Sequence, residues 1–161
     1  MSPAIAVHQV EPQAFVSVRE HCQQRDIPGF VERAFGELYR RLWEMSIAPS
    51  GRPFVIYHAF GPDGVDAEVA LPVRERIAET EHVMNGALPA LCVARVLHLG
   101  PYDAIGDSYS ALATWIEDHG YQTSGPVLER YLLGPRDGVP ASRFRTEIEM
   151  PLVQEAVAAP V

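Results

Sequence analysis

Glu129 is the residue whose place in the sequence points most directly to chemistry. It lies in the run 125–131 (GPVLERY), which has the alternating pattern of a β-strand. In a strand, Glu129 shares one face with Val127 and Tyr131, so a carboxylate stands at an apolar position. A buried carboxylate is costly unless it is paired or used. The alternative is a glutamate on a solvent-exposed sheet face, and the pattern alone leaves both interpretations open.

Aromatic residues gather in the same parts of the chain. They are Tyr57, Tyr102, Tyr109, Trp115 and Tyr131. A cavity lined by aromatic rings and containing one carboxylate is a good receptor for a flat or cationic molecule, through stacking and cation–π contacts. The alternative is that the rings fill the core beneath a sheet, and for Tyr109 and Trp43 we favour that interpretation.

No other pattern indicates a catalytic or metal centre. The six histidines lack the spacing of metal ligands, and no glycine-rich loop is present to hold a phosphate. No serine lies in the strand–turn–helix pattern of a hydrolytic nucleophile. We therefore predict no metal and no cofactor, and these patterns assign no catalytic residue.

The segment that holds Glu129 is the second copy of a repeat. Residues 51–62 (GRPFVIYHAFGP) recur as residues 125–135 (GPVLERYLLGP), and Pro53 and Pro126 are 73 positions apart. In this alignment Glu129 replaces Ile56. Each copy follows a helix-like segment with a tryptophan and precedes an acidic strand-like run that ends in proline. Duplicated units bury a shared core, and the seam between them is where small-molecule pockets form.

An amphipathic helix is predicted before each copy. The first begins at Pro28-Gly29 and ends before Pro49, and the second follows Asp103, which we expect to cap it, and ends at Gly120. Their apolar stripes are Val31, Ala34, Phe35, Leu38, Leu42 and Met45 in the first, and Ile105, Tyr109, Leu112 and Ile116 in the second.

Strands are predicted on both sides of each helix. They occupy residues 5–10, 14–19, 54–60, 67–73, 82–84, 91–98, 127–133 and 144–151, with a turn at Asn85-Gly86 and a frayed tail at 154–161. The order strand, strand, helix, strand, strand occurs twice. We therefore predict an α+β fold in which two units form one antiparallel sheet of about eight strands. The two helices should lie on one side of it, with a ligand cleft between the halves.

Composition sets the remaining bounds. At 161 residues we expect a single domain over 1–161, with repeat 1 at about 5–75 and repeat 2 at about 80–153. No membrane span or signal peptide is apparent, so we expect a cytoplasmic protein.

A formal net charge of −8 argues against binding nucleic acid and suits cationic ligands or basic protein partners, although solubility also explains it. Cys92 is expected to be a reduced thiol in the core.

An ordered set of segments resembles a known family. In the second copy these are 98–102 (HLGPY), 125–131 (GPVLERY) and 146–152 (TEIEMPL), and in the first 18–20 (VRE), 54–58 (FVIYH) and 72–73 (PV). Over roughly residues 5–153 the chain resembles the GyrI-like small-molecule-binding superfamily. That superfamily includes the effector-binding domains of AraC-type and MerR-type multidrug transcription regulators.

The resemblance implies a duplicated fold with a ligand cleft between its halves. A glutamate on the strand after the second Gly-Pro commonly reaches into that cleft to meet cationic, aromatic ligands, and Glu129 matches it. Tyr57, Trp115 and Tyr131 match positions that often line the cleft. Together with Tyr102 from the aromatic group, these are the ligand-binding residues that we predict.

The chain departs from the regulators because it has no room for a helix-turn-helix region, so we expect a stand-alone binding domain. Some stand-alone relatives are hydrolases that open strained cyclopropane-containing compounds with a glutamate and a tyrosine. By that resemblance Glu129 and Tyr57 would be the catalytic pair. A further alternative is a protein-binding inhibitor of the DNA-gyrase type. An acidic patch outside the cleft would favour this alternative.

Overall fold

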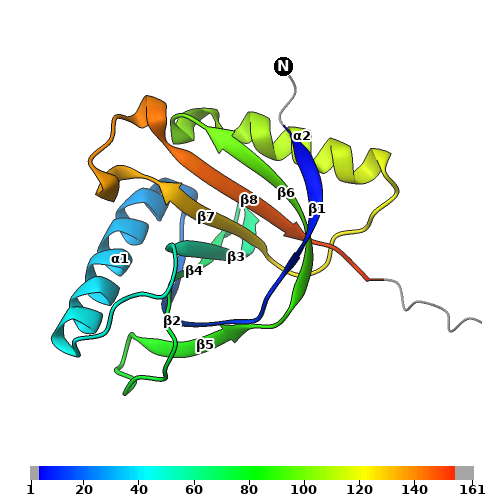
Figure 1. The fold of residues 1–161 in the computed structure, drawn as a ribbon. Helices are drawn as coiled ribbons and strands as arrows, with labels where there is room; N and C mark the ends of the chain where they lie inside the picture. Colours follow the sequence, from blue (N-terminus) through cyan, green and yellow to red (C-terminus); the bar gives the residue numbers. More distant parts are fainter. Residues whose placement is uncertain (1–3, 155–161) are drawn as a thin grey trace, which may run out of the picture.

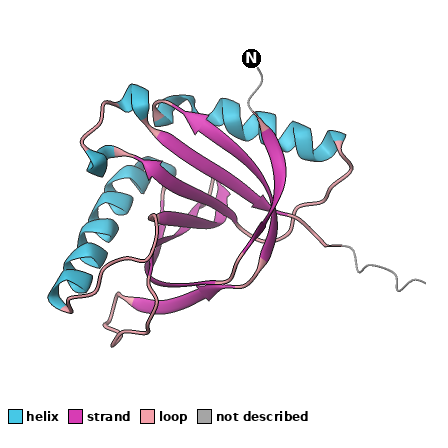
Figure 2. Ribbon diagram, viewed as in Figure 1, coloured by secondary structure: helices cyan, strands magenta, loops and turns pink. Residues whose placement is uncertain are grey.

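Eight strands and two helices make up the part of the chain that the computed structural model describes, residues 4–154 (Figures 1 and 2). The elements are β1 (Ile5–Val10), β2 (Gln13–Cys22), α1 (Ile27–Glu44), β3 (Phe54–Gly61), β4 (Gly64–Pro72), β5 (Met84–Leu88), β6 (Leu91–Leu99), α2 (Ile105–Asp118), β7 (Val127–Leu133) and β8 (Arg145–Pro151). The order strand, strand, helix, strand, strand therefore occurs twice, and the predicted α+β fold is confirmed.

All eight strands form one antiparallel sheet in the order β1-β6-β8-β7-β3-β4-β2-β5. The central pair is β3 and β7, one from each repeat, and the order reads the same outward from this pair in both directions. The first strand of each repeat is exchanged, because β1 pairs with β6 and β5 pairs with β2. Each half of the sheet is therefore completed by a strand from the other repeat.

Both helices pack on the outer side of the curled sheet, where they leave its central strands between them (Figure 1). The stripe of α1, with Ala34, Phe35, Leu38 and Leu42 buried, forms one cluster with β2 and β4. Leu112 and Ile116 of α2 form a second cluster with β6 and β8. Because each helix covers its own half of the sheet, β3 and β7 are left as the floor between them.

The inner side of the curl is filled by the sheet's own side chains. Phe15 and Phe54 meet edge to face at 5.5 Å, and a buried charge network lies beside them. Glu149, with no exposed surface, accepts hydrogen bonds from Arg95 Nε at 2.8 Å and from Arg130 Nε at 2.7 Å. Glu147 also pairs with Arg95, at 3.1 Å, so two carboxylates balance the two guanidinium groups on the inner face.

The two copies of the repeat are related by a different displacement from the one that the prolines suggest. A β-bulge falls at His58 in β3 and at Leu132 in β7, which are 74 positions apart. A displacement of 74 also joins Tyr57 to Tyr131 and Val55 to Glu129. The alignment of Glu129 with Ile56 is thus wrong, because a slip of one residue moves a side chain to the other sheet face. Ile56 packs on the inner side with Leu128.

Two local predictions are also corrected. Asn85 and Gly86 lie inside β5 and form no turn. A Cβ atom at Gly86 would lie 2.4 Å from the ring of Phe15, so this glycine allows β5 to pass over a buried ring. Asp103 does not cap α2; it lies in a 3-10 turn at Tyr102–Ala104, and α2 begins without a side-chain cap. The tail beyond Gln154 lies outside the described residues.

Candidate ligand-binding site

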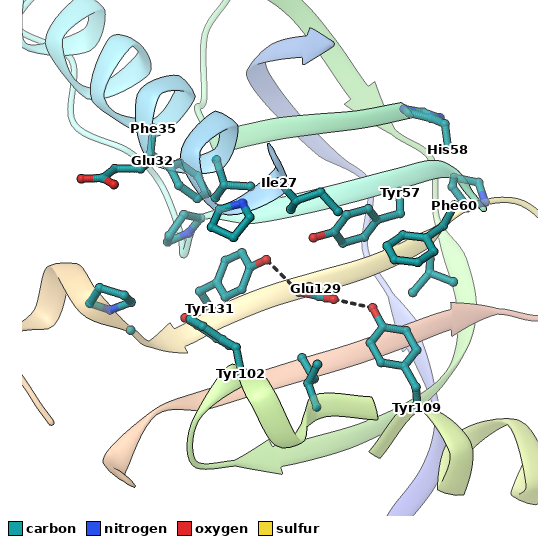
Figure 3. A pocket seen from close by; sticks show the side chains of 18 of the residues that line it. Ile27, Glu32, Phe35, Tyr57, His58, Phe60, Tyr102, Tyr109, Glu129 and Tyr131 are labelled. Atoms are coloured by element: carbon teal, nitrogen blue, oxygen red, sulfur yellow. Dashed lines mark hydrogen bonds between the residues drawn. The ribbon is translucent and has the colours of Figure 1, made fainter. Parts of the chain in front are cut away.

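A cavity of about 1170 Å³ opens over β3 and β7 between the first turns of the two helices. Its walls are the start of α1, the segment that leads into α2, and the turn that follows β7. Its lining includes Phe35, Tyr57, Tyr102, Tyr109, Glu129 and Tyr131 (Figure 3). A volume of this size accommodates a drug-sized molecule, and the predicted cleft between the halves is present.

Glu129 lies at the centre of the cavity floor because of its place in the strand register. Directly paired residues form a row across seven strands, and side chains of such a row share one sheet face. The row is Val18, Val69, Val55, Glu129, Ile148, Val96 and Ile5. Every other member is a valine or an isoleucine, so the carboxylate stands alone in a β-branched row between the two helix-covered clusters.

Two tyrosine hydroxyls hold the Glu129 carboxylate. Tyr131, two residues further along β7, donates a hydrogen bond to Oε1 at 2.8 Å, and Tyr109 of α2 donates a short one to Oε2 (Figure 3). Glu129 is 8% exposed. Burial raises the pKa of Glu129, while the hydrogen bonds from Tyr109 and Tyr131 act in the opposite direction. The two donors thus preserve part of the carboxylate character that burial opposes.

Glu129 forms no ion pair among the described residues, although the His98 imidazole acts on it electrostatically in the direction that lowers its pKa. The ion pairs within residues 4–154 involve other carboxylates, and Arg130, the neighbour of Glu129 in sequence, pairs with Glu149 on the opposite sheet face. A buried carboxylate without a cation is held at a cost that an incoming positive charge relieves. The site is therefore electrostatically suited to a ligand that brings its own cation.

Aromatic rings surround this carboxylate. Tyr131 meets Phe35 at 6.2 Å and Tyr102 at 6.0 Å, both edge to face, and Tyr57 meets Phe60 in the same way at 6.0 Å. Burial, with the nearby Glu129 charge, raises the pKa of Tyr102 to about 12 and raises the pKa of Tyr57 and Tyr109 further. The phenols remain neutral donors at physiological pH, so the walls present ring faces and hydroxyls around one anion.

The polar groups at the rim of the cavity are engaged with one another. His58 Nε2 lies 2.8 Å from Glu68, and Asp137 pairs with Arg52 at 3.6 Å. The Arg136 guanidinium lies over the Tyr39 ring, 4.9 Å from its centroid. Figure 3 shows the carboxylate of Glu32 directed away from Glu129. The interior charge of the site therefore comes from Glu129.

Four of the five predicted ligand-binding residues are brought together here: Glu129, Tyr57, Tyr131 and Tyr102 line one cavity. Trp115 is placed elsewhere. It lies in the second half of α2, and its ring stacks on His119 at 3.9 Å and on Tyr121 at 5.9 Å. It also packs against the cluster that Leu112 and Ile116 form with β6 and β8.

Tyr109 is the residue that sequence reasoning missed. We expected it to fill the core, yet it lines the cavity and contacts Glu129. The sequence did contain a signal for this role. Tyr109 lies on the apolar stripe one turn after Ile105, at the N-terminal end of α2, which borders the cavity between the two repeats. Trp43, also expected in the core, is 83% exposed at the end of α1.

Within residues 4–154, no group of three or more histidine, cysteine, aspartate or glutamate side chains is arranged to hold a metal ion. Neither described helix has the length and apolar character needed to cross a membrane. Both cysteines, Cys22 and Cys92, are free and partly buried.

Comparison with known proteins places the chain by sequence and by fold. A family model described as a GyrI-like small molecule binding domain matches residues 4–153. None of the curated proteins compared with the chain is significantly similar in sequence.

Solved structures share the fold. One is EcmrR: in its DNA complex the similarity has a TM-score of 0.85 and 21% identity, covering 94% of this chain and 58% of that chain. The EcmrR C-terminal domain alone gives 0.80 and 21%, over 96% of this chain and 100% of that one. This chain thus spans little more than half of the EcmrR chain seen with DNA.

Two further solved structures have the same fold, and one is named as a hydrolase and the other as bound to a ligand. A hydrolase from Listeria innocua has a TM-score of 0.70 and 14% identity, with 94% of this chain and 93% of that chain covered. SAV2435 bound to tetraphenylphosphonium has a TM-score of 0.68 and 17% identity, with 93% and 94% covered. At these identities the likeness shows the fold alone.

Proposed function

The chain belongs to the GyrI-like family of small-molecule-binding domains, and we propose that it binds aromatic, lipophilic cations in the cavity between its repeats. Glu129 is the counter-ion, and the tyrosines and Phe35 provide the apolar contact. One observation carries this proposal: a nearly buried carboxylate stands in an aromatic cavity without an ion-pair partner among the described residues. A cation seated against Glu129 supplies the missing charge, and the ring faces add cation–π attraction.

The hydrogen bonds around Glu129 favour one kind of cation. Each carboxylate oxygen already accepts a tyrosine hydroxyl, so its charge is available while much of its hydrogen-bonding capacity is used. A primary ammonium loses strong hydration on entry and recovers few hydrogen bonds. A phosphonium, a quaternary ammonium or a delocalised dye cation loses less hydration and needs no acceptor. We therefore propose ligands whose charge is spread or shielded by aromatic groups.

Glu129→Gln tests this proposal, because it keeps the size of the side chain and removes its charge. Affinity for tetraphenylphosphonium, measured by calorimetry, should fall by about 1–3 kcal/mol, the scale of a lost charge-assisted contact. Affinity for triphenylphosphine oxide, a neutral probe of similar shape, should change little. Glu32→Gln is the matched control at the cavity rim and should leave both affinities unchanged. Equal loss for the two probes would contradict a counter-ion role.

Hydrolysis is a second candidate function, favoured by the raised pKa of Glu129 and by its hydrogen bond from Tyr131 at 2.8 Å. In this alternative Glu129 removes a proton from water, the water oxygen bonds to a carbon of a strained ring, and a ring bond breaks. The opened carbon then takes up a proton, so water is added overall. A phenol such as Tyr57 or Tyr109 would be the proton donor.

Turnover separates the two functions. Incubation with an activated cyclopropane and analysis of the product by mass spectrometry should show no water-adduct product if the domain only binds. If the domain hydrolyses, product accumulates with the natural sequence and disappears with Glu129→Gln, while binding of the uncharged substrate persists.

A further inference from the structure

His98 lies beside the cavity and is hydrogen-bonded at both ring nitrogens. It is on β6, 5% exposed, and does not line the cavity. Its Nδ1 is 2.8 Å from Ser108 Oγ in the first turn of α2, and its Nε2 is 2.8 Å from the Pro101 carbonyl in the turn before α2. One imidazole therefore joins the sheet to both ends of the segment between residues 101 and 108.

The partners fix which nitrogen of the neutral ring carries the proton. The Pro101 carbonyl can only accept, so Nε2 donates to it, and Nδ1 accepts the hydroxyl proton of Ser108. The Pro101 carbonyl also accepts the Ala104 N–H at 3.4 Å, which uses its second lone pair. The arrangement therefore holds the ring in one orientation as well as in one tautomer.

The segment that His98 holds carries two tyrosines of the cavity wall. Tyr102 lies one residue after Pro101, and Tyr109 lies one residue after Ser108. Among the described residues, the two His98 bonds are the only side-chain hydrogen bonds that residues 101–108 make. The segment is otherwise held by packing, with the Tyr102 ring 5.2 Å from Phe144 and Ile105 against the core, and α2 begins without a side-chain cap. Loss of the His98 contact should loosen Tyr109 before it affects the sheet.

We propose that His98, through Ser108 and Pro101, is the positioning residue that sets Tyr109 against the Glu129 carboxylate and so sets the cation affinity of the cavity. This inference rests on the proposed function. His98 does not line the cavity; beside a direct electrostatic action on Glu129, its effect reaches the ligand through Tyr109. It follows that disturbing His98 or Ser108 should impair cation binding selectively, in the same way as removing the Tyr109 hydroxyl.

Ser108→Ala is the principal test, with Ser110→Ala as the matched control on the exposed face of the same helix. Tetraphenylphosphonium affinity should fall about threefold to tenfold in Ser108→Ala, the scale of one hydrogen bond, and stay unchanged in Ser110→Ala. Triphenylphosphine oxide affinity should stay unchanged in both. The full chain is used throughout, and circular dichroism confirms that each variant is folded.

Coupling to Tyr109 distinguishes a positioning role from ordinary packing. If Ser108 acts through the Tyr109 hydroxyl, the double variant Ser108→Ala/Tyr109→Phe should bind the cation no more weakly than Tyr109→Phe alone. His98→Gln can keep the bond to Pro101, and His98→Asn the bond to Ser108, so we expect His98→Asn to retain more of the cation affinity. Additive losses in the double variant would overturn the inference.

The outcomes separate this inference from the function on which it rests. If Glu129→Gln fails to weaken tetraphenylphosphonium binding, the proposed function is wrong. If Glu129→Gln weakens it but Ser108→Ala behaves like Ser110→Ala, the function stands and the role assigned to His98 is wrong.

Discussion

Val55 and Glu129 face each other directly across β3 and β7, and they occupy corresponding places in the two repeats. One repeat fills the central position of the sheet with a valine, and the other fills the same position with a carboxylate. Because the other repeat has an apolar residue at the equivalent place, we expect that the charge of Glu129 is not required for folding. The asymmetry between the two repeats is concentrated at the centre of the cavity floor.

Cation affinity should rise with pH. Burial raises the pKa of Glu129, so in the free protein a larger share of this group is protonated at mildly acidic pH than for an exposed glutamate. A bound cation favours the ionised form and releases that proton. Tetraphenylphosphonium affinity measured between pH 5 and 8 should increase and then level off, while Glu129→Gln should give a flat profile. A flat profile in the natural sequence would show that Glu129 stays ionised throughout.

The same group should lower the stability of the ligand-free domain as pH rises. Between the pKa of glutamate in the unfolded chain and the raised pKa in the folded one, the folded state holds a proton that the unfolded state has lost. Unfolding free energy therefore decreases with pH across this window. In urea denaturation, Glu129→Gln should gain stability relative to the natural sequence as pH is raised, and Glu32→Gln should not.

Removing the Tyr109 hydroxyl should weaken the site specifically. Tyr109→Phe takes one donor from Glu129, so the pKa of Glu129 rises further and cation affinity at neutral pH falls by about 1 kcal/mol. Tyr102→Phe is the control, because Tyr102 lines the same cavity and donates no hydrogen bond to Glu129. Calorimetric titration of both variants with tetraphenylphosphonium measures the difference. Equal losses would indicate that ring packing, not the hydrogen bond, dominates.

On the inner face, Glu149→Gln should destabilise the fold without involving the cavity. The change leaves Arg95 and Arg130 partly buried without their shared carboxylate, which costs about 3–5 kcal/mol of unfolding free energy. Glu147→Gln is the comparison, since Glu147 is 22% exposed and reaches Arg95 at 3.1 Å; it should cost about 1 kcal/mol or less. Chemical denaturation measures both, and similar costs would contradict the assigned roles.

Gly86→Ala should destabilise the domain by about 1–3 kcal/mol, because the new methyl group would overlap the buried Phe15 ring. Gly61→Ala adds the same group where no atom lies within 4 Å, and its effect should stay within about 0.5 kcal/mol. Thermal and urea denaturation of the two variants give the comparison. A small effect at Gly86 would mean that β5 moves aside without cost.

The sequence was sufficient for the architecture because the relevant signals are local. The apolar stripe through Leu38 and Leu42 and the alternation around Glu129 depend only on helix and strand periodicity, and both patterns recur in the structure. Asn85-Gly86 was misread because a glycine needed for close approach to Phe15 looks the same in sequence as a glycine needed for a turn.

The site was only partly predictable, because it depends on relationships that cross the sheet. Glu129 and Tyr131 share a strand, so their proximity follows from alternation. The contact between Glu129 and Tyr109 depends on how far the start of α2 extends over the seam, which no local pattern reports. The equivalence of Val55 and Glu129 was hidden by prolines displaced by 73, and it became visible through the matched bulges at His58 and Leu132.

The exchange of β1 and β5 bears on how such a chain can arise and how it can be divided. In this fold the first strand of each unit pairs with the second strand of the other unit, so the two units complete each other by donating that strand across. The duplicated chain therefore has the topology of a strand-swapped homodimer joined into one polypeptide. Cutting the chain in the connection between β4 and β5 gives two fragments with complementary strand edges. Each fragment then supplies the strand, β1 or β5, that pairs with the second strand of the other fragment.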